Sequence, residues 1–208
     1  MRKRINIVDP EKYFLLLSIL QLFGCAYFNT FYNAQNYFEE AEKIRLEKEG
    51  YVIPVTAIDK YGKSIQKCQK VLSTYPDSRF KINATLLMAK SRFYRQDYDL
   101  ALDNLKVVIL EGSKSQIEEA QYWIAICKWK KGNAQTGIDE LTQLLQLSKA
   151  KRIKSKCYLS LAEISNELKD SDAELSYLEK AAEFTKDRSE KGVIYGQLAE
   201  MSFERKNY

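Results

Sequence analysis

The sequence predicts an all-α chain of about nine helices arranged in antiparallel pairs. Eight glycines and three prolines in 208 residues supply few of the tight turns that a sandwich or barrel of short strands needs. Leu, Ala, Lys, Glu and Gln, which are good helix formers, are abundant along the whole chain. A third observation, a segment that recurs at a nearly constant spacing, indicates that the helices form a stacked array.

The composition also excludes several classes of function. There is no histidine, which removes Ser-His-Asp and Cys-His nucleophiles and most transition-metal sites. Lys and Arg number 33 against 28 Asp and Glu, and a net charge of +5 is too small for a typical nucleic-acid-binding surface. Because carboxylates alternate with lysines, no acid and base pair stands out. We therefore expect no enzyme, metal, cofactor, nucleic acid or small-molecule substrate.

A short leader is predicted at the N-terminus. Basic residues 2–4 precede an apolar run over residues 14–23, which has the length of a signal-peptide core and about half that of a bilayer-spanning helix. The run ends at residues 22–25 (Leu-Phe-Gly-Cys), which resemble the bacterial lipobox, whose cysteine receives diacylglycerol. This resemblance implies a lipoprotein signal peptide over residues 1–24 and a lipid anchor on Cys25. The alternative is a hydrophobic N-terminal helix with an incidental cysteine.

The predicted anchor also suggests a location. The residue after the cysteine is Ala26. By analogy with enterobacterial sorting, the absence of Asp at this position implies transfer to the outer membrane. We expect a protein that is anchored to the periplasmic face of the bacterial outer membrane and does not span it.

One pattern repeats along the rest of the chain. Its anchor is an alanine at spacings of 36, 37 and 37 residues, found at Ala89, Ala125, Ala162 and Ala199. A short polar turn follows the anchor helix, and then a second helix has small or apolar residues at i, i+4 and i+7. These residues are Ala101, Leu105 and Val108 in one unit and Gly137, Leu141 and Leu144 in the next. The repeating unit is therefore a helix pair.

The repeat resembles the tetratricopeptide repeat, in which small residues let the paired helices approach closely. The best local matches are residues 98–101 (Tyr-Asp-Leu-Ala) and 132–133 (Gly-Asn). Gln96 and Lys206 replace the usual glycine, and the unit around Ala173 is out of phase by one residue. The resemblance implies a tetratricopeptide-type α-solenoid of antiparallel helix pairs over residues 51–208.

A second motif lies at residues 75–78 (Tyr-Pro-Asp-Ser). The proline is expected to end one helix, and Ser78 is expected to N-cap the next. The helix before it carries a predicted core stripe of Ile65, Cys68, Val71 and Leu72. Such a junction followed by a helix pair looks like the outer-membrane tetratricopeptide lipoproteins of the BamD/YfiO and CpoB/YbgF type.

Residues 25–50 are predicted to form an aromatic-rich N-terminal helix, from about residue 27 to about residue 48. Its apolar stripe consists of Tyr27, Phe31, Ala34, Phe38 and Ala41, with Phe28 and Tyr32 beside it. We expect this helix to cap the array. The alternative places some of the aromatic rings at the lipid headgroup boundary.

Three cysteines remain after Cys25. An odd number does not suit a disulfide framework, so Cys68, Cys127 and Cys157 are predicted to be buried thiols, with a bridge between Cys127 and Cys157 as the alternative. A basic cluster over residues 149–156 is expected to be a solvated loop and first turn, with binding of anionic headgroups as the alternative.

The end of the sequence predicts an incomplete last repeat. Tyr208 aligns with Tyr98, where a second helix would begin. The residues expected to lack a covering helix are Tyr195, Leu198, Ala199 and Phe203. Either the chain is a fragment of a longer array, or another molecule covers this face.

Stacked helix pairs form a concave groove that binds extended peptides or partner helices. The candidate groove residues lie on the first helices of two units and are Lys90, Phe93, Tyr94, Tyr122, Ile126, Trp129 and Lys130. We expect a scaffold for envelope proteins and for unfolded or extended peptides. The resemblance implies an accessory of β-barrel assembly of the BamD type, with a CpoB-like coordinator of envelope and peptidoglycan machinery as the alternative.

Overall fold

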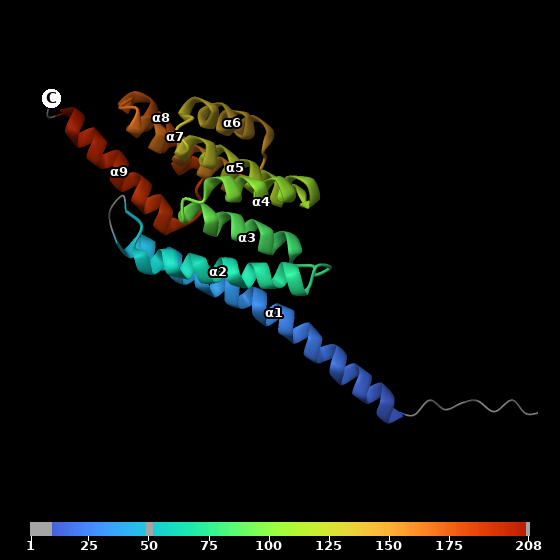
Figure 1. The fold of residues 1–208 in the computed structure, drawn as a ribbon. Coiled ribbons are helices and arrows are strands. Elements are labelled where there is room, and N and C mark those ends of the chain that lie inside the picture. The colour runs from blue at the N-terminus through green and yellow to red at the C-terminus, as the bar shows by residue number, and fades with distance from the viewer. Residues whose placement is uncertain (1–9, 49–51, 207–208) are drawn as a thin grey trace, which may run out of the picture. The chain divides into compact units, whose positions relative to one another are not determined.

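The computed structural model describes the backbone of residues 10–48 and 52–206 and the side chains of residues 28–48 and 52–203. Nine α-helices and no strand occur within this part of the chain (Figure 1). They are α1 (Pro10–Glu47), α2 (Val55–Thr74), α3 (Lys81–Tyr94), α4 (Tyr98–Glu111), α5 (Lys114–Lys130), α6 (Ala134–Leu147), α7 (Lys151–Glu167), α8 (Ser171–Phe184) and α9 (Arg188–Lys206). The predicted all-α class is confirmed.

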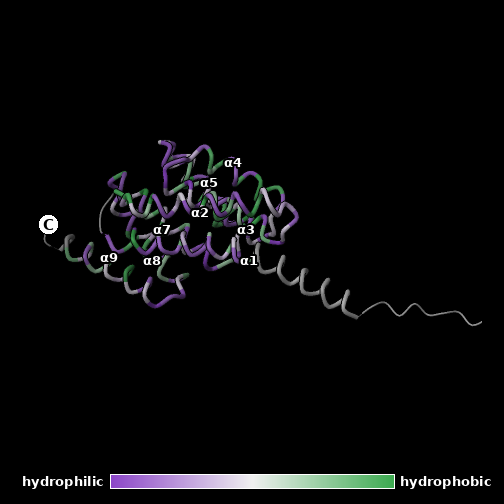
Figure 2. Tube along the Cα trace, turned by 60° about the horizontal axis from the view of Figure 1, so that its bottom comes forward, coloured by the Kyte–Doolittle hydropathy of each residue, from purple (hydrophilic) through white to green (hydrophobic). Residues whose placement is uncertain are grey.

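The chain divides into two compact units, Met1–Arg95 with α1 to α3 and Gln96–Tyr208 with α4 to α9. Within each unit, helices that follow one another in sequence pack side by side in antiparallel pairs. In addition, α1 contacts α3 in the first unit and α5 contacts α7 in the second. Hydrophobic and hydrophilic residues alternate along many of these helices (Figure 2), as expected when one side of each helix is buried.

The first unit has a core made by α1, α2 and α3. On α1 the predicted apolar stripe is confirmed for Phe31, Ala34, Phe38 and Ala41, all of which are buried. The side chain of Tyr27 lies outside the described part of the structure. The predicted stripe of α2 is also confirmed, because Cys68 and Val71 are buried and Ile65 and Leu72 pack against them. Beside the stripe of α1, Phe28 and Tyr32 are about half exposed.

Helix α1 is longer than predicted. It begins at Pro10, whereas the aromatic stripe alone placed its start near residue 27. Residues 11–26 contain many leucines and no proline, so nothing in that segment ends the helix. The helix thus continues through residue 25, where the leader is predicted to end, and that boundary stays a prediction. No described helix is long and apolar enough to cross a membrane.

The second unit repeats with a period of 37 residues. Helices α5 and α7 have 17 residues each, helices α6 and α8 have 14 each, and the corresponding ends differ by 37 in number. The unit around Ala173 is therefore in phase in the structure, with Leu178 at the place of Leu141 and both buried. The expected phase shift is wrong because Glu174, not Ala173, occupies the place of Gly137.

Close contacts at the predicted small residues hold each pair together. Ala101 and Ala125 are fully buried. A Cβ atom added to Gly137 would lie 2.9 Å from the Cβ of Trp129 and 3.2 Å from the carbonyl oxygen of Ala125. Helix α6 therefore approaches α5 closely because residue 137 has no side chain.

The junctions between pairs use the same positions in successive repeats. Ser148, directly after α6, donates a hydrogen bond from its hydroxyl to Glu118 at 2.9 Å. Thr185, directly after α8, shares a hydrogen bond of 2.6 Å with the hydroxyl of Ser155. Residues 155 and 185 lie 37 positions after residues 118 and 148. The two three-residue connections are thus fixed in the same way.

The start of α3 differs from the prediction. Ser78 is not the N-cap, because α3 begins at Lys81 and Phe80 precedes it. The Ser78 hydroxyl instead accepts a hydrogen bond of 3.1 Å from the backbone N–H of Phe80. The turn after the proline is thus two residues longer than the sequence motif suggested.

The three cysteines of the helical units are free and buried, as predicted. The alternative of a bridge between Cys127 and Cys157 is wrong for this structure. Burial raises the pKa of each of the thiols of Cys68, Cys127 and Cys157 to about 12. They behave as small apolar side chains of the core.

Helix α9 has one covered and one open side. Ile194 is buried against the α7–α8 pair, and Leu198 and Met201 pack beside it. On the other side, Tyr195 and Phe203 are exposed, as the sequence predicts, whereas Leu198 is partly covered and departs from that prediction. Tyr208 lies outside the described residues.

Candidate protein-binding face

The best candidate site in the second unit is formed by the adjoining sides of α5 and α7, here called the α5–α7 face. Both are first helices of a repeat, and they contact each other although α6 separates them in sequence. Residues spaced by three or four along each helix share this side. Four predicted groove residues lie on it, namely Tyr122, Ile126, Trp129 and Lys130.

Two of these residues are more buried than a groove position would be. Ile126 is 4% exposed and Trp129 is 5% exposed. The indole Nε1 of Trp129 donates a hydrogen bond of 2.9 Å to the carboxylate of Glu167 on α7. Both side chains therefore hold α5 and α7 together and offer little surface to a partner.

Tyr122 also connects the two helices. Its hydroxyl lies 2.9 Å from the hydroxyl of Ser160 on α7. Burial raises the pKa of the Tyr122 phenol, and the hydrogen bond with Ser160 offsets part of that increase. The phenol is thus neutral and acts as a hydrogen-bonding group.

Lys130 lies among acidic groups near the C-terminal end of the face. Its ammonium group is 3.1 Å from Glu163 and 3.0 Å from Glu167, and it lies 3.5 Å from the ring centroid of Trp129. The side chains of Glu163 and Glu167 remain 59% and 49% exposed. One lysine and two exposed carboxylates leave this end of the face acidic.

The N-terminal end of the face has the opposite charge. Glu119 is largely buried, and it pairs with Arg152 at 2.6 Å and with Lys156 at 3.8 Å. Lys156 also lies over the rings of Tyr122 and Trp123. One carboxylate serves two cations here, so the N-terminal end of α7 is basic. Part of the basic cluster over residues 149–156 thus belongs to this face.

Sequence reasoning missed the residues of α7 and the carboxylate of Glu119. A signal for several of them was present, since Tyr122 and Ser160, Trp129 and Glu167, and Lys130 and Glu167 are separated by 37 or 38 residues. These separations match the period of the repeat. Placing the first helices of successive repeats side by side would have suggested these pairs.

The other three predicted groove residues lie on α3 in the first unit. Tyr94 stacks on Tyr61 with ring centroids 5.0 Å apart, and the guanidinium of Arg45 lies 4.7 Å from its ring centroid. Lys90 lies 4.9 Å from the ring centroid of Phe38, while Phe93 contacts Tyr94 edge to face. Lys90 and Tyr94 therefore contribute to packing against α1 and α2.

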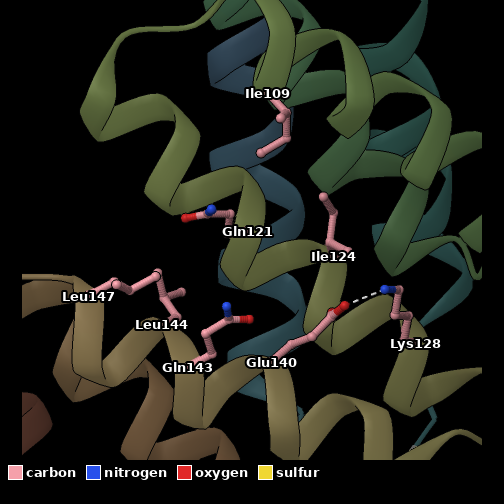
Figure 3. Close-up of a pocket in the computed structure, with 8 residues that line it drawn as sticks. All are labelled: Ile109, Gln121, Ile124, Lys128, Glu140, Gln143, Leu144 and Leu147. Atoms are coloured by element: carbon pink, nitrogen blue, oxygen red, sulfur yellow. Dashed lines mark hydrogen bonds and ion pairs between the residues drawn. The ribbon is translucent and has the colours of Figure 1, made fainter.

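A pocket of about 350 Å³ lies elsewhere in the second unit, between α4, α5 and α6 (Figure 3). We call it the α4–α6 pocket. Its lining residues are Ile109, Gln121, Ile124, Lys128, Glu140, Gln143, Leu144 and Leu147. No group of three His, Cys, Asp or Glu residues suitable for a metal ion occurs in the described part of the chain. The α5–α7 face and this pocket are the two features with defined binding chemistry.

The fold and these contacts place the chain among all-α proteins built from tetratricopeptide-type helix pairs. No family model and no curated protein matches the sequence. Similar solved structures include a crystal structure of MamA with 17% identity and a TM-score of 0.47, covering 72% of this chain and 93% of that one. A second crystal structure of MamA has 18% identity and a TM-score of 0.43, covering 85% and 95%. At this distance, the likeness carries no argument about function.

Proposed function

We propose that the protein is a lipid-anchored scaffold that binds partner proteins through the α5–α7 face. The observation that carries this proposal is the arrangement of exposed charge on a rigid support. Hydrogen bonds from Tyr122 and Trp129 hold α5 and α7 together, and α7 then presents basic residues at one end and acidic residues at the other. Such a face suits a helix or an extended peptide with the opposite order of charges.

The charged ends define how a partner would be oriented. An acidic segment would lie near Arg152 and Lys156, and a basic segment would lie near Glu163 and Glu167. Because these side chains are partly exposed and already paired within the protein, each added ion pair contributes modestly, about 0.2 to 1 kcal/mol. Selectivity would come from the whole pattern of charge.

A double charge reversal, Glu163→Lys with Glu167→Lys, tests this face. The matched control is Glu179→Lys with Glu183→Lys on α8, which has the same spacing and also changes two exposed carboxylates. A photo-crosslinking residue at position 166, which is exposed between the two carboxylates, would capture the partner in cells. Loss of the crosslinked product in the first variant and its retention in the control are expected. Equal crosslinking in both variants would rule out this face.

Anchoring through Cys25 is the second part of the proposal. It is supported by the lipobox-like sequence at residues 22–25, because only a thiol accepts the diacylglyceryl group. Cys25→Ser is expected to abolish incorporation of a labelled fatty acid and to leave an uncleaved or soluble species. Label retained by this variant would mean that residue 25 is not the attachment site.

For the cellular role, we propose an accessory of β-barrel assembly of the BamD type at the periplasmic face of the outer membrane. The supports are the lipobox-like sequence, the repeat pattern and the junction at residues 75–78. A CpoB-like coordinator of envelope and peptidoglycan machinery is the alternative, supported by the same features. Affinity purification from detergent-solubilised outer membranes separates them. Recovery of a BamA-like barrel favours the first, and recovery of peptidoglycan-synthesis or Tol components favours the second.

A further inference from the structure

The α4–α6 pocket combines apolar walls with one unsatisfied acceptor. Its apolar residues are Ile109, Ile124, Leu144 and Leu147. At the polar end, one oxygen of Glu140 pairs with Lys128, as Figure 3 shows. The other oxygen, Oε2, is buried and has no hydrogen-bond partner among the described residues. Because buried acceptors are normally satisfied, a ligand that brings one donor to this oxygen would complete the site.

The next repeat indicates what kind of group fits such a hollow. The residues 37 positions after Gln121, Glu140 and Leu147 are Tyr158, Tyr177 and Phe184. In the structure, the ring of Tyr158 stacks on that of Phe184 with centroids 5.6 Å apart and lies 6.3 Å from that of Tyr177. The equivalent space between the later helices is thus filled by aromatic rings of the chain itself. Between α4, α5 and α6 these rings are missing, and the pocket is open.

We propose that the α4–α6 pocket binds a tyrosine or tryptophan side chain of a partner protein. The flat ring would lie between the isoleucines and leucines, as the aromatic rings do in the next repeat. The phenol O–H or indole N–H would donate to Oε2 of Glu140. Phenylalanine has no such donor and would leave the carboxylate oxygen unsatisfied, so it would bind more weakly.

A protein side chain suits the pocket better than a free small molecule. Leu147 lines the pocket but is 65% exposed, and Gln121 and Gln143 are also exposed at its edge. The polypeptide on either side of an inserted ring would cover the leucine and pair with the two amides. The pocket volume of about 350 Å³ is near the lower end of ligand pockets, roughly 300 to 1,000 Å³. This inference rests on the protein-binding function proposed above but uses a separate surface.

Titration of the ¹⁵N-labelled full chain with capped amino acids tests the proposal by NMR. N-acetyl-tyrosinamide and N-acetyl-tryptophanamide are expected to shift the amide signals of Ile124 and Leu144 and to bind about tenfold more tightly than N-acetyl-phenylalaninamide. The comparison with p-cresol, which is the tyrosine side chain without a backbone, identifies the source. Binding of p-cresol with exclusion of N-acetyl-tyrosinamide would overturn the assignment to a protein side chain.

Two variants locate the binding. In Glu140→Gln, the amide oxygen remains with Lys128 and the amide nitrogen turns toward the pocket, so the preference for tyrosine over phenylalanine is expected to disappear. Gln121→Tyr copies the next repeat and is expected to fill the pocket and abolish binding. Gln146→Tyr adds the same ring at an exposed position of α6 outside the pocket and is the matched control.

The outcomes separate this proposal from the scaffold function. Unchanged tyrosine binding in both Glu140→Gln and Gln121→Tyr would refute the pocket site, even if crosslinking through the α5–α7 face persists. Loss of crosslinking at that face with intact tyrosine binding would refute the scaffold function proposed for it and retain the pocket. If Gln121→Tyr does not fold, the loss of the tyrosine preference in Glu140→Gln alone decides the result.

Discussion

Gln96 and Lys169 have left-handed backbone conformations, with φ of 63° and 61°. Gly132, with φ of 95°, occupies the equivalent turn of the repeat between them. Side chains other than glycine are strained in this region. The sequence already showed that Gln96 stands at a position usually held by glycine, and the structure shows that the turn keeps its shape when glycine is absent.

Replacing Lys169 with glycine is therefore expected to stabilise the protein. Relief of the left-handed strain exceeds the added flexibility of the unfolded chain, so the free energy of unfolding should rise by about 0.5 to 1 kcal/mol. Thermal or urea denaturation followed by circular dichroism measures this change. Lys186→Gly, in a connection whose φ is not positive, is the control and should give no gain. A loss of stability in Lys169→Gly would contradict the assignment of strain.

Gly137 and Gly192 provide an opposite pair of predictions. Gly137→Ala should lower the free energy of unfolding by about 1 to 3 kcal/mol, because the new Cβ would lie 2.9 Å from the Cβ of Trp129. Gly192→Ala in α9 should raise it by about 0.5 to 1 kcal/mol, because none of the described residues lies within 4 Å of the new atom. Equal effects of the two substitutions, measured by denaturation, would show that the approach of α6 to α5 is not tight.

At the scale of helices, the contact between α5 and α7 depends on a few polar bonds within an otherwise apolar packing. Trp129 and Glu167 make one of them, at 2.9 Å. The sequence predicted that Trp129 lies on the side facing other first helices, and this is confirmed. It did not predict that the side chain is buried, because a single helix pattern shows which side is apolar but not how much of that side the next repeat covers.

A double-mutant cycle measures this bond. Trp129→Phe keeps an aromatic ring but removes the donor, and Glu167→Gln removes the charge of the acceptor. Since Glu167 is half exposed, the coupling free energy between the two positions is expected to be about 0.5 to 1 kcal/mol. The cycle is read from urea denaturation of the four proteins. A coupling near zero would mean that the bond adds nothing to the contact of α5 with α7.

For the whole molecule, the spacing of the anchor alanines was the strongest signal in the sequence. It predicted the helix pairs, their length and the buried positions of Ala101, Leu105 and Leu141. It did not predict the division into two units after Arg95, because the spacing from Ala89 to Ala125 runs across that point without a change. It also missed the α4–α6 pocket, which arises where three aromatic side chains of one repeat are replaced in another.

Reactivity of the cysteines offers a test that covers both units. Cys68 lies in the first unit, and Cys127 and Cys157 lie in the second. With pKa values of about 12, these thiols stay protonated at pH 8 and should react with a thiol reagent only after unfolding. Mass spectrometry after timed labelling, with and without denaturant, identifies each site. Rapid labelling of any of the three in the native protein would contradict its burial.

The identical bounds of successive repeats also have an evolutionary consequence. The segment from α5 to α6 and the segment from α7 to α8 have equal helix lengths, equal connections and the same hydrogen-bonded positions at the junction, residues 118 and 148 in one and 155 and 185 in the other. A gene duplication of one 37-residue block would therefore insert a unit whose two ends already match its neighbours. Such arrays can change length by recombination without a new solution for packing, and the number of repeats becomes a trait on which selection acts.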